Sequence, residues 1–417
     1  MATVHVVGAG LAGLACAVRL VRGGRTVVLY EAAAQAGGRC RSRFEAALDR
    51  RIDNGNHLVL GGNGATMAYL DEIGARDTLL SAPALVFPFV DLRSGARWTL
   101  RPNAGPLPWW IFAPSRRVPG SRARDYLAGL RLARAGPHDT VAGVLDGDRA
   151  LFERFWEPLA VAMLNAAADE GAARLFWRAL ALSFGRGGRG CRAYVAREGL
   201  SASFVDPAVA WLGARRCAPS FGARLRGVEF DAGRAVRLDF GDRAAAGGAA
   251  DGVVLALPPA RVAEMLPGVR VPSESRAIVN AHFRLARPAA PPDGSPFLGV
   301  IGGSAQWVFV RGDVASVTVS AADAMLDVAS EEIAAVLWAD VTRALEIADA
   351  PLPPFRIVKE RRATFAQTPS QVALRPAART RYANLYLAGD WTDTGLPATI
   401  ESAVRSGHTA ARLILEG

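Results

Sequence analysis

Residues 4–18 read VHVVGAGLAGLACAV, and this stretch decides the fold. A short apolar run with strand character leads directly into a G-x-G-x-x-G turn made by Gly8, Gly10 and Gly13. Apolar residues then recur at helical spacing, and a second apolar strand follows at residues 26–30. The pattern predicts a βαβ unit whose glycine turn lies against the pyrophosphate of a dinucleotide.

Each position of the turn has a separate physical role. Gly8 allows the tight turn, Gly10 leaves room for the pyrophosphate, and Gly13 lets helix and strand pack closely. The helix that begins at Leu11 and Ala12 offers free N–H groups and a partial positive charge to the phosphates. The alternative is an ordinary glycine-rich turn between a strand and a helix.

Two features after the second strand fit the same ligand. Glu31 ends that strand, where its carboxylate can accept hydrogen bonds from both hydroxyls of a ribose. Gly37, Gly38 and Arg39 follow in a loop, where adjacent glycines allow close approach of a ligand and the arginine suits phosphate. This loop is therefore a further candidate for contact with the ligand.

The C-terminal part of the chain repeats this chemistry. An apolar strand at residues 385–388 runs into Gly389 and Asp390, and a helix follows. The Asp390 carboxylate can accept hydrogen bonds from hydroxyls, and Gly389 permits close approach. The helix start at Thr399 and Ile400 directs N–H groups at an electron-rich ligand edge. The alternative is an ordinary terminal βα unit.

Composition sets the broad class of the protein. The chain has 417 residues, 51% of them hydrophobic, which is enough for two or three domains and a large core. Its formal charge is +10, and Lys359 is the only lysine, so the basic residues are almost all arginines. This charge gives a mild preference for anionic partners. No arginine run is interleaved with aromatic residues, which argues against nucleic acid as a partner.

The cysteines and the hydropathy pattern indicate a compartment. The four cysteines show neither C-x-x-C spacing nor a metal-binding pattern, so we predict reduced thiols in a cytoplasmic protein without a metal. No apolar run approaches the ~20 residues that span a bilayer. We expect a protein that is soluble or lies on a membrane surface.

Taken together, these motifs and the stretch VVLALPP at residues 253–259 resemble the FAD-dependent amine oxidase and phytoene desaturase superfamily, end to end. Three stretches resemble one branch of it, the squalene-associated hydroxysqualene dehydroxylases. They are DNGNH at 53–57, FWEPL at 155–159 with Leu164-Asn165, and GDWTDTGLPATIE at 389–401.

The resemblance implies an α/β fold. A Rossmann-type FAD-binding domain of the glutathione reductase type would be interleaved with a mixed α+β substrate domain. We assign residues 1–82, 198–268 and 378–417 to the FAD-binding domain. Residues 83–197 and 269–377 would form the substrate domain.

The resemblance also assigns residues to the cofactor FAD. Glu31 would bind the adenosine ribose, and residues 38–39 would lie along the phosphates and the isoalloxazine. Leu225 would contact adenine through its backbone, Asp390 would lie near the ribitol and pyrophosphate, and residues 399–400 at the pyrimidine end of the flavin. The full set is Gly8, Gly10, Leu11, Ala12, Gly13, Glu31, Gly38, Arg39, Leu225, Gly389, Asp390, Thr399 and Ile400.

One departure from the superfamily concerns a lysine. Its amine oxidases usually keep a lysine near flavin N5, on a strand of the substrate domain. The matching strand here, residues 278–283, has none, and Lys359 lies far downstream. This departure argues against amine oxidation.

The reaction that the resemblance implies is loss of the hydroxyl from the C30 isoprenoid hydroxysqualene, with hydride delivery by reduced flavin to give squalene in hopanoid synthesis. Departure of the hydroxyl needs an acid, and an apolar pocket must exclude water. His57 is the first candidate, and a structural histidine is the alternative. Glu157 is the second, because burial would raise its pKa, with a partly exposed carboxylate as the alternative. Asp53 either orients His57 or, as we prefer, caps the turn.

Residues 109–112, WWIF, precede several arginines and a helix expected from about residue 121 to 135. One interpretation is shallow insertion into an anionic membrane, with Trp at the interface and arginines on headgroups. Peripheral attachment to the inner face of the cytoplasmic membrane would follow. The other is core packing or the lining of a substrate tunnel, and the sequence leaves both open.

Two other functions remain open at this stage. The same fold could serve a carotenoid-type desaturase or isomerase, or a non-catalytic flavin-containing protein that binds lipid. No second dinucleotide fingerprint indicates where the electrons would come from.

Overall fold

The βαβ unit predicted at the start of the chain is present. Strand β1 (Thr3–Val7) leads into helix α1 (Leu11–Arg22), and β2 (Thr26–Tyr30) pairs with β1 in parallel. Parallel neighbours need a crossover connection, which α1 provides. The computed structural model describes residues 2–145, 149–242, 244–246, 251–347 and 350–417.

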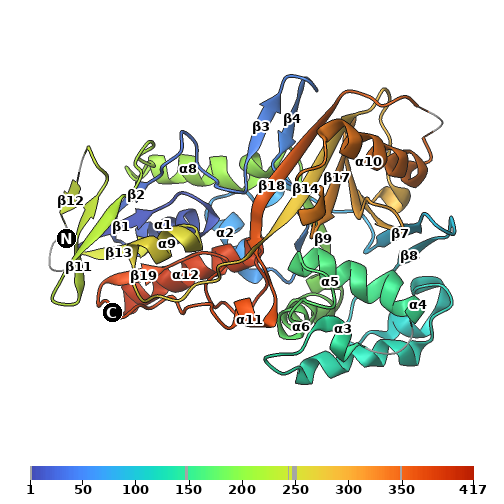
Figure 1. The fold of residues 1–417 in the computed structure, drawn as a ribbon, viewed down its shortest axis with the longest axis horizontal. Helices are drawn as coiled ribbons and strands as arrows, with labels where there is room; N and C mark the ends of the chain where they lie inside the picture. The colour runs from blue at the N-terminus through green and yellow to red at the C-terminus, as the bar shows by residue number, and fades with distance from the viewer. Residues whose placement is uncertain (1, 146–148, 243, 247–250, 348–349) are drawn as a thin grey trace.

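Distant parts of the chain complete this parallel sheet. Strand β13 (Gly252–Leu255) pairs with β1, and β19 (Leu385–Leu387) pairs with β13, giving the order β19-β13-β1-β2. The last helix, α12 (Ile400–Glu416), lies so close to α1 that a Cβ at Gly407 would be 2.1 Å from the carbonyl oxygen of Ala12. The chain therefore leaves the sheet and returns to it twice, as predicted, and Figure 1 shows α12 and α1 in one layered unit.

A second, larger sheet has the order β18-β14-β17-β16-β15-β7-β8. Its neighbours are antiparallel except for β15 and β7. The predicted mixed α+β region is therefore confirmed. Its strands are β7 (Phe87–Asp91), β8 (Arg97–Leu100), β14 (Ser275–Arg284), β15 (Phe297–Ile301), β16 (Trp307–Arg311), β17 (Val314–Ser320) and β18 (Phe355–Phe365).

The two faces of this sheet pack on different layers. Leu298 joins a mainly aliphatic core that includes Leu337 of helix α10 (Ser330–Leu345), while its neighbour Phe297 joins a core rich in aromatic residues with Phe155 and Trp156. This split follows from the alternation of side chains along a strand. Helical segments after β8 cover the aromatic face (Figure 1). They are η2 (Trp109–Phe112), η3 (Pro114–Arg116), η4 (Ala123–Arg134), α3 (Val141–Val144), α4 (Arg149–Leu151), η5 (Phe152–Trp156), α5 (Glu157–Leu164), α6 (Ala173–Leu182), η6 (Phe184–Arg186) and α7 (Gly187–Cys191).

Shorter elements connect these layers. The remaining strands are β3 (Ser42–Glu45), β4 (Arg50–Asp53), β5 (Val59–Leu60), β6 (Leu79–Leu80), β9 (Ala193–Ala196), β10 (Gly227–Asp231), β11 (Arg234–Asp239) and β12 (Ala244–Ala246). The remaining helices are α2 (Gly64–Glu72), η1 (Arg76–Thr78), η7 (Ser201–Val205), α8 (Asp206–Gly213), α9 (Pro259–Met265), η8 (Pro292–Gly294), η9 (Asp323–Met325) and α11 (Pro369–Val372).

Candidate functional site

The three glycines of the turn differ in what surrounds them. Gly8 has φ +106°, and a Cβ there would lie 2.4 Å from the carbonyl oxygen of Ala256. A Cβ at Gly13 would lie 1.8 Å from the carbonyl oxygen of Gly8. At Gly10 a Cβ would meet no atom within 4 Å. Packing therefore requires the first and third glycines, whereas the second faces the open space that a ligand would use.

The N-terminus of α1 opens onto the same space. Gly10 is its N-cap and provides no side-chain cap, so the first-turn amides of Leu11, Ala12 and Gly13 have no side-chain acceptor from that position. Unpaired N–H groups at a helix start form an anion-binding site. The geometry fits a pyrophosphate at this point.

Glu31 connects the glycine turn to the loop after β2. Its Oε2 accepts a hydrogen bond from the Ala9 amide, and its Oε1 accepts one from the Ala33 amide, both at 2.8 Å. Each carboxylate oxygen keeps a further lone pair, so these bonds leave acceptor capacity for ribose hydroxyls. The contact with ribose stays a prediction.

The loop with the paired glycines lies beside the glycine turn. The Gly37 amide donates to the carbonyl oxygen of Ala9 at 2.8 Å, and Gly37 forms a bridge with Gly10. Both loop glycines have positive φ, +106° at Gly37 and +58° at Gly38. Side chains are disfavoured in that conformation, which explains the glycine pair.

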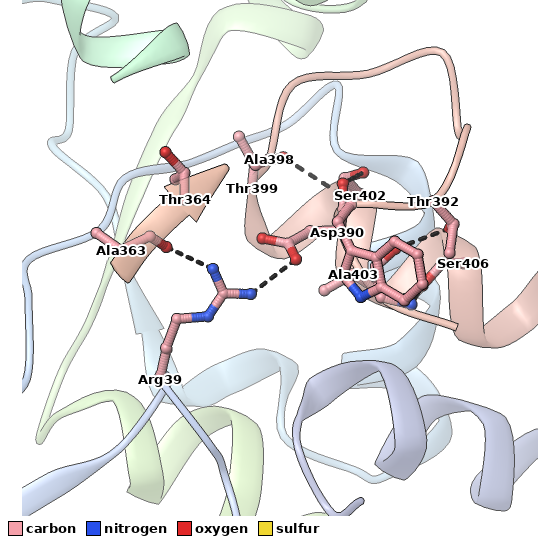
Figure 2. Close-up of polar contacts among 12 residues, drawn as sticks. Arg39, Ala363, Thr364, Asp390, Thr392, Ala398, Thr399, Ser402, Ala403 and Ser406 are labelled. Carbon is pink, nitrogen blue, oxygen red and sulfur yellow. Dashed lines mark hydrogen bonds and ion pairs between the residues drawn. The ribbon is translucent and has the colours of Figure 1, made fainter. Parts of the chain in front are cut away.

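Arg39 joins the two ends of the chain. Its Nη2 donates to Oδ1 of Asp390 at 2.7 Å, and its Nη1 donates to the carbonyl oxygen of Ala363 in β18 (Figure 2). Asp390 is 6% exposed, whereas the Arg39 side chain is about half exposed. The Asp390 carboxylate raises the pKa of Arg39 above its usual value. Two residues predicted separately to contact the cofactor are thus in direct contact.

The segment after Asp390 leads to the N-terminus of α12, which lies close to the Arg39–Asp390 ion pair. Gly389 has φ +151°, and a Cβ there would lie 2.4 Å from Nε1 of Trp391. Thr399 caps α12, because its hydroxyl accepts a hydrogen bond from the Ser402 amide at 3.3 Å. Figure 2 shows Thr399 and Ser402 beside Asp390, so the N-terminus of α12 lies next to the carboxylate that Arg39 contacts.

Leu225, which is predicted to contact adenine through its backbone, lies outside the helices and strands of the structure. Leu225 precedes strand β10, which begins at Gly227. Its side chain is 3% exposed and packs in a core with Tyr30 of β2. Its carbonyl oxygen accepts a hydrogen bond from Arg261 at 3.2 Å, which occupies part of the backbone surface that we assigned to adenine.

His57 lies in the electrostatic field of the Arg39 region. Its side chain is exposed, yet the surrounding protein desolvates it, and this lowers its pKa below the ordinary 6.5. The positive charge of Arg39 lowers the pKa further, while Asp53 opposes the shift. His57 is thus linked electrostatically to Arg39, a residue predicted to contact the cofactor.

A polar network fixes the loop that carries His57. Asn54 Nδ2 donates to Glu360 at 3.0 Å, and the carbonyl oxygen of Asn54 accepts from Asn280 at 3.3 Å. Thr318 donates to Oδ1 of Asn280 at 2.8 Å and accepts from Asn56 Nδ2 at 3.1 Å. Three strands of the larger sheet therefore hold the loop at residues 54–56.

Asp53 does not act on His57 through a hydrogen bond that the structure describes. Its Oδ1 accepts from the Ser42 hydroxyl at 2.6 Å and from the Leu200 amide at 2.8 Å. Its Oδ2 accepts from Arg311 at 2.8 Å. Asp53 is therefore a structural carboxylate, close to the capping role that we preferred.

Glu157 lies in a different environment. It begins α5 and lines a cleft of about 390 Å³ together with Arg93, Glu153, Gln306 and Trp307. Burial raises the pKa of Glu157, and the carboxylates of Glu153 and Asp169 add to the increase. The groups that act on Glu157 are not those that act on His57, so the structure does not bring the two candidate acids together.

The sequence model of the family described as flavin containing amine oxidoreductase matches residues 11–415. The chain belongs to this family. Hydroxysqualene dehydroxylases from Rhodopseudomonas palustris and Zymomonas mobilis are 47% and 40% identical to it. The matches cover 99% and 100% of this chain, and 98% and 99% of those proteins. Within the amine oxidoreductase family, the chain therefore belongs with the hydroxysqualene dehydroxylases.

Solved structures of the same fold include wild-type putrescine oxidase bound to putrescine, with a TM-score of 0.73 and 19% identity. The match covers 100% of this chain and 99% of that one. Cyclohexylamine oxidase from Brevibacterium oxydans is similar at a TM-score of 0.69 and 15% identity, over 100% of this chain and 98% of that one. These likenesses confirm the predicted fold class.

The lysine that this family's amine oxidases usually keep has no equivalent on β14. Lys359, the only lysine of the chain, pairs across the sheet with Val279. Its Nζ donates to the carbonyl oxygen of Leu326 at 2.9 Å. Side chains alternate along a strand, so Lys359 points away from the face on which Glu360 meets Asn54. The amine oxidoreductase fold here thus lacks that lysine.

Two residues near the site carry no signal in the sequence. Arg375 is 7% exposed and donates to the carbonyl oxygens of Asp390, Thr392 and Leu396 at 3.2, 3.0 and 2.8 Å. Burial lowers its pKa to about 10. The second residue is Glu360, which accepts a hydrogen bond from Asn54 and whose negative charge raises the pKa of Arg39. Neither belongs to a motif, so only the folded chain reveals them.

Proposed function

We propose that this chain binds FAD and reductively removes the hydroxyl group of hydroxysqualene to give squalene in hopanoid synthesis. The observation that carries the proposal is the 40–47% identity, over essentially the whole chain, to three hydroxysqualene dehydroxylases. The absence of a lysine on β14 fits it as well, since amine oxidation is then not the expected chemistry.

The cofactor contacts support FAD as the flavin. The open space at Gly10 and the N-terminus of α1 fit a pyrophosphate. Arg39 and Asp390 bring a cation and a carboxylate to one place, which suits phosphates on one side and ribitol hydroxyls on the other. Glu31 keeps acceptor capacity for the adenosine ribose. An extended dinucleotide, rather than a shorter flavin, uses all of these groups.

The reaction requires that a C–O bond break, that the oxygen leave with a proton as water, and that a hydride take its place. Reduced flavin supplies the hydride when the cofactor is bound. The protein must supply the proton and keep water from the allylic cation. The aromatic core that lies against Leu58 and Leu60, directly after His57, provides an apolar surface beside the candidate acid.

His57 is the proton donor that we favour, because it shares the electrostatic environment of Arg39. Its lowered pKa means that the imidazole is mostly neutral at neutral pH, so it must take up a proton before it can donate one. Glu157 holds its proton to higher pH than an ordinary carboxyl, but it lines the cleft with Arg93 and Glu153, and neither of these is a predicted cofactor contact. As the proton donor, His57 is therefore favoured by its electrostatic link to Arg39, whereas Glu157 is favoured by its raised pKa.

We also propose attachment to the surface of an anionic membrane, at the inner face of the cytoplasmic membrane, because a C30 isoprenoid partitions into lipid. In the described part of the chain, no helix is both long enough and apolar enough to cross a bilayer. Access to such a substrate would then be from one side of the membrane.

Product analysis tests the proposed reaction. Purified protein reconstituted with FAD and reduced without air is given hydroxysqualene, and the lipids are extracted and analysed by mass spectrometry. We expect squalene to accumulate, and only if the flavin was reduced first. Formation of a more unsaturated product with oxidised flavin would instead support a desaturase. Binding of the lipid with no product in either state would support a non-catalytic lipid-binding protein.

A further inference from the structure

The helix η4 leaves an apolar column on the protein surface. A 3₁₀ helix has three residues per turn, so positions three apart lie in one column. Tyr126, Gly129 and Leu132 are buried at this spacing, and a Cβ at Gly129 would lie 2.6 Å from the Trp156 ring. The next column holds Leu127 and Leu130, which are 55% and 61% exposed. The inner column anchors the helix, whereas more than half of each outer side chain is exposed in the described structure.

The neighbouring helix η2 divides the WWIF stretch between core and surface. Trp110 and Ile111 are buried, and Trp110 packs edge-on against Tyr126 of η4. Trp109 and Phe112 are 63% and 61% exposed, with their ring centroids 5.9 Å apart. Core packing therefore accounts for Trp110 and Ile111, whereas Trp109 and Phe112 are available for contact with a partner.

Helices η2 and η4 are in contact through Trp110 and Tyr126, and we call the surface that carries their exposed apolar side chains the η2–η4 surface. Five of the eleven large apolar side chains that are exposed in the described part of the chain fall between residues 107 and 130. Contiguous exposed apolar side chains mark interaction sites. In Figure 1 this segment lies at the end of the molecule opposite both chain termini. The five residues are Leu107, Trp109, Phe112, Leu127 and Leu130.

The charge around the η2–η4 surface is strongly positive. Residues 101–138 contain seven arginines and one acidic residue, Asp125. The Asp125 carboxylate is engaged at the start of η4, where it accepts a hydrogen bond from the Arg122 amide at 2.6 Å. Arg116, Arg122 and Arg134 are exposed. A partner of this surface must therefore provide both an apolar region and negative charge.

We propose that the η2–η4 surface docks on an anionic lipid bilayer. Trp and Phe enter the interface between headgroups and acyl chains, and the arginines meet the headgroups. A second copy of this chain fits less well, because a two-fold interface would set each arginine cluster against its own copy. The inference deepens the proposed function in one respect, since it names the surface through which a lipid-dissolved substrate would be reached.

Vesicle sedimentation tests the docking without any substrate. The FAD-loaded protein is mixed with vesicles of phosphatidylcholine alone or with added phosphatidylglycerol. We expect binding to require the anionic lipid and to weaken in high salt. The variant Trp109→Ser/Phe112→Ser/Leu127→Ser/Leu130→Ser should bind at least about tenfold more weakly. The matched control Phe44→Ser/Phe221→Ser, which changes exposed rings elsewhere, should bind like the wild type.

A second variant covers the case in which the serine variant fails to fold. Arg116→Gln/Arg122→Gln/Arg134→Gln leaves the apolar side chains in place and should weaken binding by about tenfold to a hundredfold. Flavin absorbance and the thermal unfolding midpoint report whether each variant is folded. Unchanged binding by both folded variants overturns the proposal, as does a wild-type dimer that the serine variant dissociates. Dehydroxylation of substrate in detergent micelles is measured separately, so failure of docking and failure of the proposed reaction are distinguishable.

Discussion

The two candidate proton donors occupy contrasting regions of the molecule. His57 lies on a loop held by Asn280 and Thr318, in the field of Arg39, whereas Glu157 lines the cleft with Arg93 and Glu153. Burial favours the uncharged form in both cases, but with opposite consequences for the proton. The uncharged carboxyl keeps its proton and the uncharged imidazole has lost it. A perturbed pKa alone therefore does not identify a proton donor, and the position of the group relative to the cofactor must decide.

The largest effect is expected from a substitution that abolishes FAD binding near Arg39. Gly10→Val should fold, because a Cβ there meets no protein atom within 4 Å, but it should lose FAD since its side chain enters the space of the pyrophosphate. Gly13→Val is the contrasting variant, since its Cβ would lie 1.8 Å from the carbonyl oxygen of Gly8 and should prevent folding. Flavin absorbance and thermal unfolding separate the two outcomes. A Gly10→Val protein that remains yellow would place the cofactor elsewhere and remove the advantage of His57.

The next largest effect separates the two candidates directly. His57→Ala should retain FAD and lose about 10²–10⁴-fold in turnover, the usual contribution of a general acid. Glu157→Gln keeps the shape of the side chain, removes its proton, and should turn over within a few-fold of the wild type. Steady-state rates with reduced FAD decide between them. The reverse pattern would assign the proton to the Glu157 cleft.

The pH dependence sharpens the same comparison. Since the pKa of His57 is lowered below 6.5, its protonated fraction falls at pH values above that lowered pKa. If His57 donates the proton, kcat/KM should fall by about tenfold for each pH unit in that range. The decline should persist in Glu157→Gln and be absent from the residual activity of His57→Ala. A decline that Glu157→Gln abolishes would contradict the assignment.

The smallest effect concerns the ion pair that marks the cofactor side. Arg39→Gln removes the charge that pairs with Asp390 and should weaken FAD binding by about tenfold. Arg93→Gln is the matched change in the cleft and should leave FAD affinity unchanged. Titration of the apoprotein with FAD measures both. Equal losses in the two variants would mean that Arg39 has no particular role at the cofactor.

The nucleotide-binding part of the fold was predictable because its rules are local. The glycine spacing lies between one strand and one helix of a single βαβ unit, so the sequence identifies the turn, although Gly8 also packs against Ala256 from a distant segment. The return of the chain near Asp390 was also visible, since a strand, a Gly-Asp pair and a helix start follow one another directly. Full-length similarity to known enzymes confirms the branch that these motifs indicate.

The rest depended on contacts between distant residues. Arg39 and Asp390 are 351 positions apart, and no local rule pairs them. Arg375 stabilises the Asp390 segment through backbone carbonyls, which leave no trace in the sequence. Glu157 lines a cleft with Arg93 and Glu153, and nothing in the sequence predicts that these side chains are its neighbours. The sequence pattern identifies helices, strands and turns, but it does not show which side chains are in contact in the folded protein.

The most direct test of the account is a single turnover without air. The FAD-loaded protein is reduced photochemically, mixed with a limiting amount of hydroxysqualene, and followed by flavin absorbance before its lipids are extracted. The account predicts that one flavin is reoxidised for each squalene formed. Reduced flavin that persists while hydroxysqualene remains unchanged would contradict it.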